Sequence, residues 1–454
     1  MFRDLRPRAL TRFVGFLFFF LCVPATAAER PLVAVGDVTP TTAVVWVRGV
    51  AEGEVVIDYG PADAAPAQSV RLRVARGSDL TGTVRLTGLR PTTRYSYRAR
   101  SDGGAAAGEF VTAPAPDAPM RVTFAWSGDL GGGRFCRPVD TGYRVFAAMA
   151  RARPDFFLFV GDTIYADYPC SGPGLAPGGD FVAQTLDQFR RKHRYNREDP
   201  ALAAFLGQTS VQAIWDDHEG RNDFAGPTDP LMPLGRRAFI EYWPVAPPAD
   251  EPTRLYRKFR WGRLLEVFIL DTRQYRSDNS APDGPAKTML GPRQRRWLTD
   301  GVTASTTTWK VVVSSVPLSV PTGPQYRDSW SNATVWGIPE ENGTGFAVER
   351  DAILNAFRQR GVKNLVFLTA DVHHAELIRH HPTPEFSFHE FIAGPLSASP
   401  GRPRPLDAAL NPRSLFARGG VNNFGAVTIE ASLLTVRLID EDGAVLFTHT
   451  IGPE

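Results

Sequence analysis

Short, nearly continuous apolar segments alternate with helical patterns between residues 121 and 454. The apolar segments are 122–126, 156–160, 264–270, 310–313 and 364–368. Strands of this composition are typically buried on both faces, under helices or under a second sheet. Apolar residues recur with helical spacing between them, at about 142–152, 180–194, 199–207, 231–242, 291–299 and 347–360. This alternation predicts an α/β domain, and residues 425–450 return to a strand pattern.

The region before this domain has a different pattern, with short β-rich segments separated by Gly, Pro and Asp turns. Residues 86–99 resemble the corner and following strand of a fibronectin type III-like sandwich, in which a Tyr hydroxyl bonds back to the backbone. We therefore expect a small all-β sandwich at 29–114, with a structural or positioning role. A Pro-rich stretch follows, and we place the linker at 115–120 and the second domain at 121–454.

The first 28 residues have the pattern of a signal peptide. Four arginines precede an apolar run at 13–23, and the small residues of 24–28 follow it. The run is shorter than the roughly 20 residues of a membrane-spanning helix, although an uncleaved anchor remains the alternative. We expect cleavage, export to the periplasm or the extracellular space, and no integral membrane segment in the product.

The net charge of the chain falls to zero once this segment is left out. The full chain of 454 residues has 51 Lys and Arg against 48 Asp and Glu, and the segment 1–28 holds four Arg and one Asp. The remainder has 47 of each sign and is neutral. A neutral protein has no general attraction to nucleic acid, so we expect no specific nucleic-acid binding. We expect a monomer.

Polar clusters follow the predicted strands of the second domain. They lie at 127–129, 161–165, 215–219, 271–273 and 370–374. Ligands of α/β sheets bind beyond the carboxyl ends of the strands, so these clusters are expected to converge. Several carboxylates at one edge would raise one another's pKa values. A multivalent cation relieves that repulsion, and carboxylate, imidazole and phenolate groups are suitable ligands for one.

Four of these motifs together resemble the PhoD-like branch of the calcineurin-like metallophosphatases. They read Gly-Asp-Thr-Ile-Tyr at 161–165, Trp-Asp-Asp-His-Glu at 215–219, Asp-Thr-Arg-Gln-Tyr-Arg at 271–276 and Ala-Asp-Val-His-His at 370–374. The resemblance spans about 31–454 and implies a four-layer αββα domain that follows a small β-domain. It also implies an exported alkaline phosphatase that hydrolyses small phosphomonoesters through a metal-activated hydroxide.

The same resemblance assigns roles to particular side chains. The expected metal ligands are Asp129, Asp162, Tyr165, Asp217, Asp371 and His373. Asp162 is expected to bridge two metals, and Tyr165 to bind Fe³⁺. Asp129 stands where better-studied members have Cys, and no His follows the strand at 310–313, so the remaining ligands are rich in oxygen. Ca²⁺ or another divalent cation therefore fits the second site.

His218 is expected beside the substrate phosphate, where it would protonate the leaving group or hydrogen-bond the phosphate. Arg221 and Arg273 lie close to motif residues, as does Arg134, and guanidinium groups bind phosphate in a bidentate manner. Three other roles stay open. Asp216 either orients His218 or caps a helix; His374 either supports the site or is an ordinary histidine; and Asn222 is either a ligand or a turn residue.

Two cysteines remain after removal of the leader. Cys136 and Cys170 both fall in loops that leave neighbouring strand ends. An oxidising compartment favours a disulfide between them, which would stiffen the metal platform. The alternative is that Cys136 binds a metal as a thiolate, in place of the Cys that the family has near Asp129.

Two other functions remain open at this point. The first is a phosphodiesterase that acts on nucleotide, teichoic-acid or lipid diesters, because one metal cluster can serve both reactions. The second belongs to another class: a surface-binding protein in which 29–114 binds and the enzyme domain is inactive. The intact set of predicted metal ligands argues against this second alternative.

Overall fold

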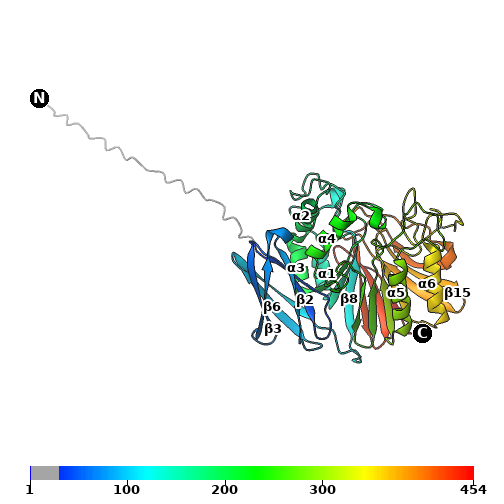
Figure 1. Ribbon diagram of the computed structural model, residues 1–454, viewed down its shortest axis with the longest axis horizontal. Helices are drawn as coiled ribbons and strands as arrows, with labels where there is room; N and C mark the ends of the chain where they lie inside the picture. Colours follow the sequence, from blue (N-terminus) through cyan, green and yellow to red (C-terminus); the bar gives the residue numbers. More distant parts are fainter. Residues whose placement is uncertain (2–29) are drawn as a thin grey trace.

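The computed structural model describes Met1 and residues 30–454. Over this part of the chain the strands form a nine-stranded sheet, in the order β20-β19-β18-β8-β9-β10-β1-β2-β5, and a seven-stranded sheet, in the order β11-β12-β13-β14-β16-β15-β17. The two sheets lie against each other with helices on their outer faces, as Figure 1 shows. The predicted four-layer αββα architecture is confirmed. The predicted signal peptide lies outside the described residues, apart from Met1.

The strands of the first region are β1 (Leu32–Gly36), β2 (Ala43–Arg48), β3 (Gly53–Pro61), β4 (Gln68–Val74), β5 (Thr81–Leu86), β6 (Arg94–Ser101) and β7 (Gly104–Val111). Those that follow are β8 (Val122–Ser127), β9 (Phe156–Val160), β10 (Ser210–Ile214), β11 (Arg257–Trp261), β12 (Leu265–Ile269), β13 (Trp309–Val313), β14 (Leu365–Thr369), β15 (Ala375–Thr383), β16 (Phe386–Ile392), β17 (Pro412–Arg418), β18 (Asn423–Glu430), β19 (Leu433–Asp440) and β20 (Val445–Ile451). The α-helices are α1 (Val145–Arg151), α2 (Leu186–Arg197), α3 (Pro200–Gln208), α4 (Met232–Tyr242), α5 (Gly291–Ala304) and α6 (Ala347–Gln359).

The central strands are buried on both faces, as their continuous apolar composition predicts. In β9, Phe156 packs edge-on against Phe259 of the facing sheet, with ring centroids 5.2 Å apart. The next residue, Phe157, points the other way and contacts Phe205 of α3 at 5.6 Å. Helices α5 and α6 cover the outer face of the seven-stranded sheet. The core therefore lies in layers between the sheets and beneath the helices.

The first region forms a sandwich in which the four-stranded sheet β4-β3-β6-β7 packs on β1, β2 and β5. Strand β1 also pairs with β10, in parallel at Gly36 and Val211, so one sheet of the sandwich continues into the larger domain. The Tyr95 hydroxyl accepts a hydrogen bond from the Arg90 backbone N–H at 2.9 Å, which is the corner bond expected at 86–99. The domain limits and the fibronectin-like assignment stay predictions.

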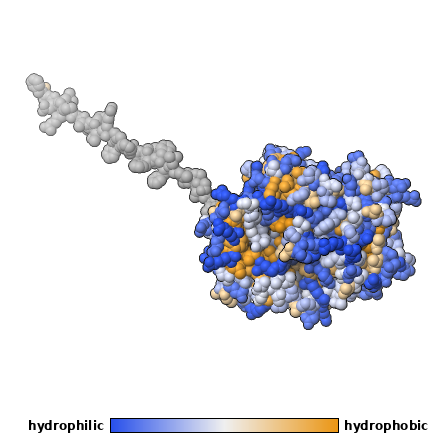
Figure 2. Space-filling view, in the orientation of Figure 1, coloured by the Kyte–Doolittle hydropathy of each residue, from blue (hydrophilic) through white to orange (hydrophobic). Residues whose placement is uncertain are grey.

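The topology places the polar clusters at one edge. Strands β8, β9 and β10 run parallel to one another, as do β12, β13 and β14, and loops leave their carboxyl ends. In Figure 2, hydrophilic residues cover much of the visible face. None of the helices within residues 30–454 has the length and apolar character needed to cross a membrane.

Candidate metal centre

Four carboxylates follow directly on the parallel strands. Asp129 follows β8, Asp162 follows β9, Asp217 follows β10 and Asp371 follows β14, and all are largely buried. Asp129, Asp162 and Asp371 have left-handed backbones, with φ of 64°, 49° and 69°. Such conformations are unfavourable for residues other than glycine, and they cluster at functional sites. Three of the four carboxylates therefore occupy strained positions directly after strands.

Glycines let the strand ends approach one another. A Cβ atom at Gly128 would lie 2.6 Å from the Val160 carbonyl oxygen. A Cβ atom at Gly161 would lie 2.6 Å from the Cβ of Asp216. Real side chains do not tolerate such contacts, so the glycine before Asp129 and the glycine before Asp162 are needed for close packing of the loops.

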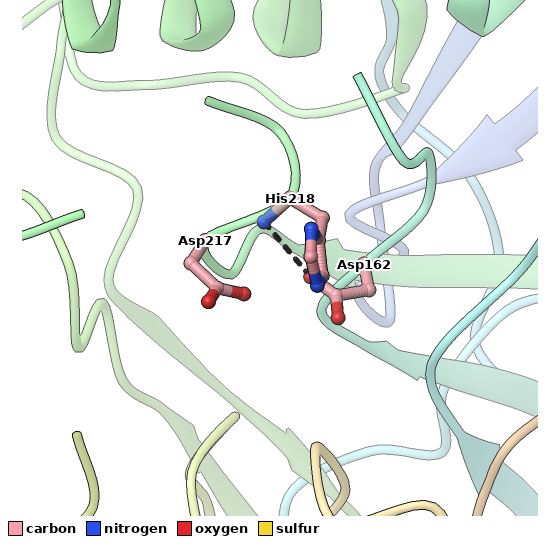
Figure 3. Close-up of side chains that lie close together, drawn as sticks. All are labelled: Asp162, Asp217 and His218. Atoms are coloured by element: carbon pink, nitrogen blue, oxygen red, sulfur yellow. Dashed lines mark hydrogen bonds between the residues drawn. The ribbon is translucent and has the colours of Figure 1, made fainter. Parts of the chain in front are cut away.

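Asp162, Asp217 and His218 form the first potential metal-binding group. Each offers a ligand atom, and these atoms lie within 4.8 Å of one another (Figure 3). The His218 backbone N–H donates to Asp162 Oδ1 at 3.2 Å. A second group of the same size contains Asp216, Asp217 and Asp371. A third contains Asp217, Asp223 and Asp328. Because Asp217 belongs to all three groups, these potential cation positions adjoin one another.

Tyr165 and His373 meet beside His218, on which the Tyr165 ring stacks. The Tyr165 hydroxyl lies 2.9 Å from His373 Nε2, and Asp129 Oδ1 lies 3.8 Å from the same nitrogen. His373 Nδ1 lies 2.7 Å from the Ser399 carbonyl oxygen, which accepts its proton. This bond fixes the tautomer in which Nδ1 carries the proton and Nε2 does not. Histidines that bind a metal usually donate their other ring N–H to a carbonyl or carboxylate in this way.

The buried carboxylates of this centre would be stabilised by a nearby positive charge. Burial, together with the neighbouring carboxylates, raises the pKa values of Asp129, Asp162 and Asp371 well above the ordinary range. Asp129 Oδ2, Asp217 Oδ1 and Asp371 Oδ2 are buried without a hydrogen-bond partner among the described residues. Buried polar atoms are nearly always paired. Hard oxygen donors that lack partners fit a bound cation, so the residues present are suited to the predicted metals.

His218 is held by a residue that the motifs did not indicate. Its Nδ1 lies 2.7 Å from Asp167 Oδ1, and the other Asp167 oxygen accepts a hydrogen bond from the Asn222 backbone N–H at 2.7 Å. Burial alone would lower the pKa of His218, but Asp217 and Asp167 outweigh it and raise the pKa to about 9. Asp167, and not Asp216, therefore orients His218.

Arg273 lies in the protein interior rather than at the substrate. Its guanidinium is fully buried and makes two hydrogen bonds to Asp328, of 2.8 and 2.7 Å, and a third to Asp216. Nη2 also lies 3.8 Å from Asp217 Oδ2. The expected direct contact with phosphate is therefore replaced by a positioning role. Arg273 neutralises two buried carboxylates and braces the strand ends.

The other predicted polar groups differ in their exposure. The Arg221 side chain is 59% exposed and pairs with Asp229, so it lies within reach of solvent. Arg134 is exposed, as is Asn222, whose backbone N–H donates to Asp167. His374 is fully buried, and its Nε2 lies 3.0 Å from Glu376, so it supports the fold behind the site.

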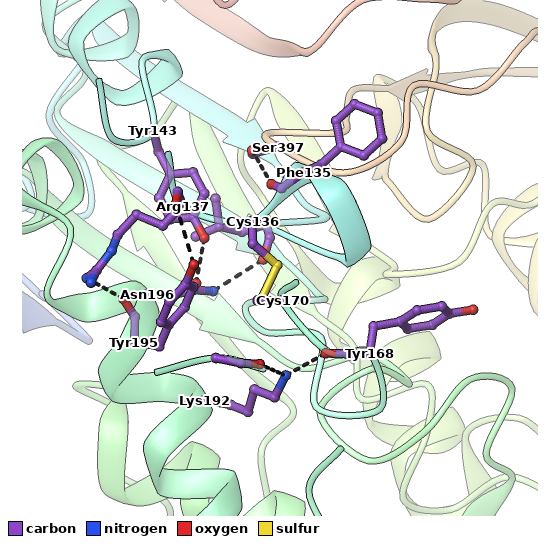
Figure 4. Close-up of a disulfide and its surroundings, with 12 residues drawn as sticks. Phe135, Cys136, Arg137, Tyr143, Tyr168, Cys170, Lys192, Tyr195, Asn196 and Ser397 are labelled. Carbon is purple, nitrogen blue, oxygen red and sulfur yellow. Dashed lines mark hydrogen bonds between the residues drawn. A yellow bond between two sulfur atoms is a disulfide. The ribbon is translucent and has the colours of Figure 1, made fainter. Parts of the chain in front are cut away.

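Cys136 and Cys170 form the predicted disulfide (Figure 4). It joins the loop after β8 to the loop after β9, which carry Asp129 and Asp162 respectively. Lys192 reinforces the second loop, because its ammonium donates to the carbonyl oxygens of Tyr168 and Gly179. A disulfide sulfur is not a thiolate, so the alternative in which Cys136 binds metal is wrong for this structure.

Comparison with known proteins places this geometry in a family. Residues 125–433 match the family model described as PhoD-like phosphatase. The chain belongs to the PhoD-like phosphatase family. A relative from Bacillus subtilis (strain 168), alkaline phosphatase D, is 26% identical over 387 residues, which cover 75% of this chain and 64% of the relative. The match thus spans less than two thirds of the length of that relative.

Solved structures support the fold of this family member. A structure of PhoD superposes with a TM-score of 0.75 at 21% identity, covering 92% of this chain and 88% of the other. A purple acid phosphatase, PPD1 from yellow lupin (Lupinus luteus) seeds, has a TM-score of 0.65 at 14% identity and covers 93% of this chain and 74% of the other. At these identities the likeness establishes the metallophosphatase fold.

Proposed function

We propose that this PhoD-like protein is a metal-dependent phosphoester hydrolase, an alkaline phosphatase that acts on small phosphomonoesters. The convergence of buried carboxylates at the strand ends carries the proposal, because three of their oxygens have no hydrogen-bond partner among the described residues. Membership of the family and the name of the Bacillus relative point to the same activity. A binding protein without catalysis would not need this costly arrangement.

Two cation positions fit the side chains. Tyr165, Asp129 and His373 would hold Fe³⁺, which suits a phenolate ligand, and Asp162 would contribute a carboxylate. Ca²⁺ or another divalent cation suits the oxygen-rich group of Asp217 and Asp371. Such cations, when bound, supply an activated water as the nucleophile and neutralise the phosphoryl oxygens.

His218 contributes to the reaction directly. Asp167 holds Nδ1, so Nε2 is the atom left for the substrate. The Asp167 carboxylate favours a protonated ring, and the Nε2 proton can then be given to the leaving alkoxide or shared with a phosphoryl oxygen. Arg221, with its exposed side chain, is the arginine placed to meet a phosphate from the solvent side.

The proposed setting follows from the leader and the disulfide. A cleaved signal peptide at 1–28 would export the protein to the periplasm or beyond, and a disulfide persists in such oxidising compartments. We propose a monomer whose partner is a small phosphoester. Sequencing the N-terminus of the protein recovered outside the cytoplasm tests this setting, and a chain that still begins at Met1 would contradict cleavage.

Asp162→Asn tests the catalytic proposal. We expect the purified variant to lose bound metal and the hydrolysis of p-nitrophenyl phosphate together, while its circular dichroism spectrum stays native. Asp63→Asn, the same change at an exposed position of the sandwich, is the matched control and should retain both. Full activity of Asp162→Asn would refute the assignment. A protein that binds metal but turns over neither a monoester nor a diester would favour the surface-binding alternative.

The iron position has a spectroscopic test. A ferric phenolate absorbs visible light, so the purified protein should be coloured and should lose that band in Tyr165→Phe. Elemental analysis of the same samples identifies both metals. An active enzyme that contains no iron would contradict this part of the proposal and leave the hydrolase assignment standing.

A further inference from the structure

Three aromatic rings form a cluster that leads outward from the metal centre. Tyr165 stacks on His218 with centroids 4.0 Å apart and planes 26° from parallel. Tyr168 meets both rings edge-on, at 6.1 Å from Tyr165 and 5.4 Å from His218. The inner rings are almost fully buried, at 6% and 7% exposure, whereas Tyr168 is 45% exposed. Tyr168 is therefore the outermost ring, in contact with solvent and with the catalytic histidine.

The backbone beneath this ring is fixed independently of the metals. Cys170, two residues further on, is tied to Cys136 by the disulfide. Lys192 donates a hydrogen bond to the Tyr168 carbonyl oxygen, and Figure 4 shows the ring projecting away from both restraints. The Tyr168 hydroxyl makes no hydrogen bond to any residue in 30–454. A rigidly mounted ring loses little conformational entropy when a ligand covers it.

We propose that Tyr168 is a specificity-determining residue that stacks on the leaving group of the substrate. The inference rests on the proposed phosphatase function. With the phosphoryl group held beside Asp162 and His218, the alcohol must extend towards solvent, and Tyr168 is the exposed ring next to His218. Rings favour flat partners, and stacking tolerates many of them. The preferred substrates are phosphomonoesters whose alcohol carries a planar ring, such as a nucleoside or an aryl alcohol.

Steady-state kinetics of the metal-loaded full chain test the proposal with three substrates. Adenosine 5′-monophosphate and phenyl phosphate carry rings, whereas glycerol 3-phosphate does not. We expect Tyr168→Ala to raise KM for the ring-bearing substrates about tenfold more than KM for glycerol 3-phosphate, as expected for one lost stacking contact. Tyr168→Phe, which keeps the ring, should behave as the wild type. Trp336→Ala removes an exposed aromatic ring from a different loop and is the control.

A second readout is inhibition by the product alcohol. Adenosine should inhibit the wild type competitively, and its inhibition constant should rise about tenfold in Tyr168→Ala. Should the alanine variant fold poorly, Tyr168→Leu keeps the apolar bulk without the aromatic ring and serves instead. A shift confined to the nucleotide would identify a nucleoside subsite, and a shift with both ring substrates would identify a general aromatic one; either supports the proposal.

Equal effects on all three substrates would overturn the role of Tyr168, and so would an unchanged preference. These results are distinct from failure of the proposed function. If the proposed phosphatase function is wrong, the wild type will hydrolyse none of the three substrates. If only the role of Tyr168 is wrong, the wild type will hydrolyse them with a preference that Tyr168 does not determine.

Discussion

Replacing Arg273 by Met separates bracing of the strand ends from contact with the substrate. The change keeps a long side chain but removes the guanidinium that pairs with Asp328 and Asp216. Both carboxylates are almost completely buried, at 1% and 2% exposure of their side chains. Removing one member of a buried ion pair typically costs about 3–5 kcal/mol, because a charge is left in the interior without a partner. Asp328 keeps its pair with Arg276, so the charge left without a partner in this variant is that of Asp216. We expect the free energy of unfolding to fall by that amount.

The assay is urea-induced unfolding of the metal-loaded protein, followed by tyrosine and tryptophan fluorescence. Arg237→Met is the matched control, because the Arg237 side chain is 58% exposed and its partner Glu241 keeps a second pair with Arg190. Such pairs contribute about 0.2–1 kcal/mol. Combining Arg273→Met with Asp328→Asn should cost less than the two single changes added, by roughly 0.5–3 kcal/mol for residues in direct contact.

A direct phosphate clamp would give a different result. If Arg273 contacted the substrate, its loss would raise KM strongly while stability stayed near that of the control. Stability within about 1 kcal/mol of the wild type would therefore refute the bracing role, since an exposed pair costs no more than this. A large loss of stability with additive single and double variants would refute the specific pairing with Asp328.

Two further changes test other contacts. Asp167→Asn weakens a charge-assisted hydrogen bond to His218 worth about 1.5–3 kcal/mol, so kcat/KM should fall more steeply for glycerol 3-phosphate, a poor leaving group, than for p-nitrophenyl phosphate; an equal fall would contradict the proton-donor role. His193 of α2, which stacks on Tyr242 of α4, has its pKa lowered to about 3 by burial and by a nearby arginine. The unfolded chain, with a pKa near 6.5, then binds protons more readily, so stability is lost as pH falls from about 6.5 towards 3, by about 2 kcal/mol at pH 5. His193→Phe should remove that part of the loss in unfolding experiments at pH 7 and pH 5, and an unchanged loss would contradict it.

The fold was predictable where strands are buried on both sides. The run at 156–160 has no polar residue, and it forms β9 in the middle of a sheet. Strand β10 is also buried, but its sequence Ser-Val-Gln-Ala-Ile mixes polar and small residues and gave no clear strand pattern. The pairing of β1 with β10 joins residues far apart in the chain, and no local pattern specifies such a contact.

The candidate metal ligands could be named from the sequence because they lie in short motifs directly after strands. Their supporting residues were not. Asp167 lies five residues beyond Asp162. Its contact with His218 depends on how the loop folds, which the sequence pattern does not specify. Asp328 lies in the long segment between β13 and α6, which has no recognisable motif. Arg273 had the right chemistry for phosphate, and only its burial against Asp328 revealed its role.

The charges at the candidate metal centre link metal binding to the stability of the fold. Arg273 forms buried ion pairs with Asp328 and Asp216, and Arg276 forms one with Asp328. The carboxylates of Asp129, Asp162 and Asp371 make no ion pair with an arginine within residues 30–454, and burial together with neighbouring carboxylates raises their pKa values. Ionising them together without cations would repel the strand ends that carry them, across loops that the disulfide already holds in place. Bound cations would convert that repulsion into cross-links between both sheets, so the groups that make the site reactive would also make the folded domain depend on its metals.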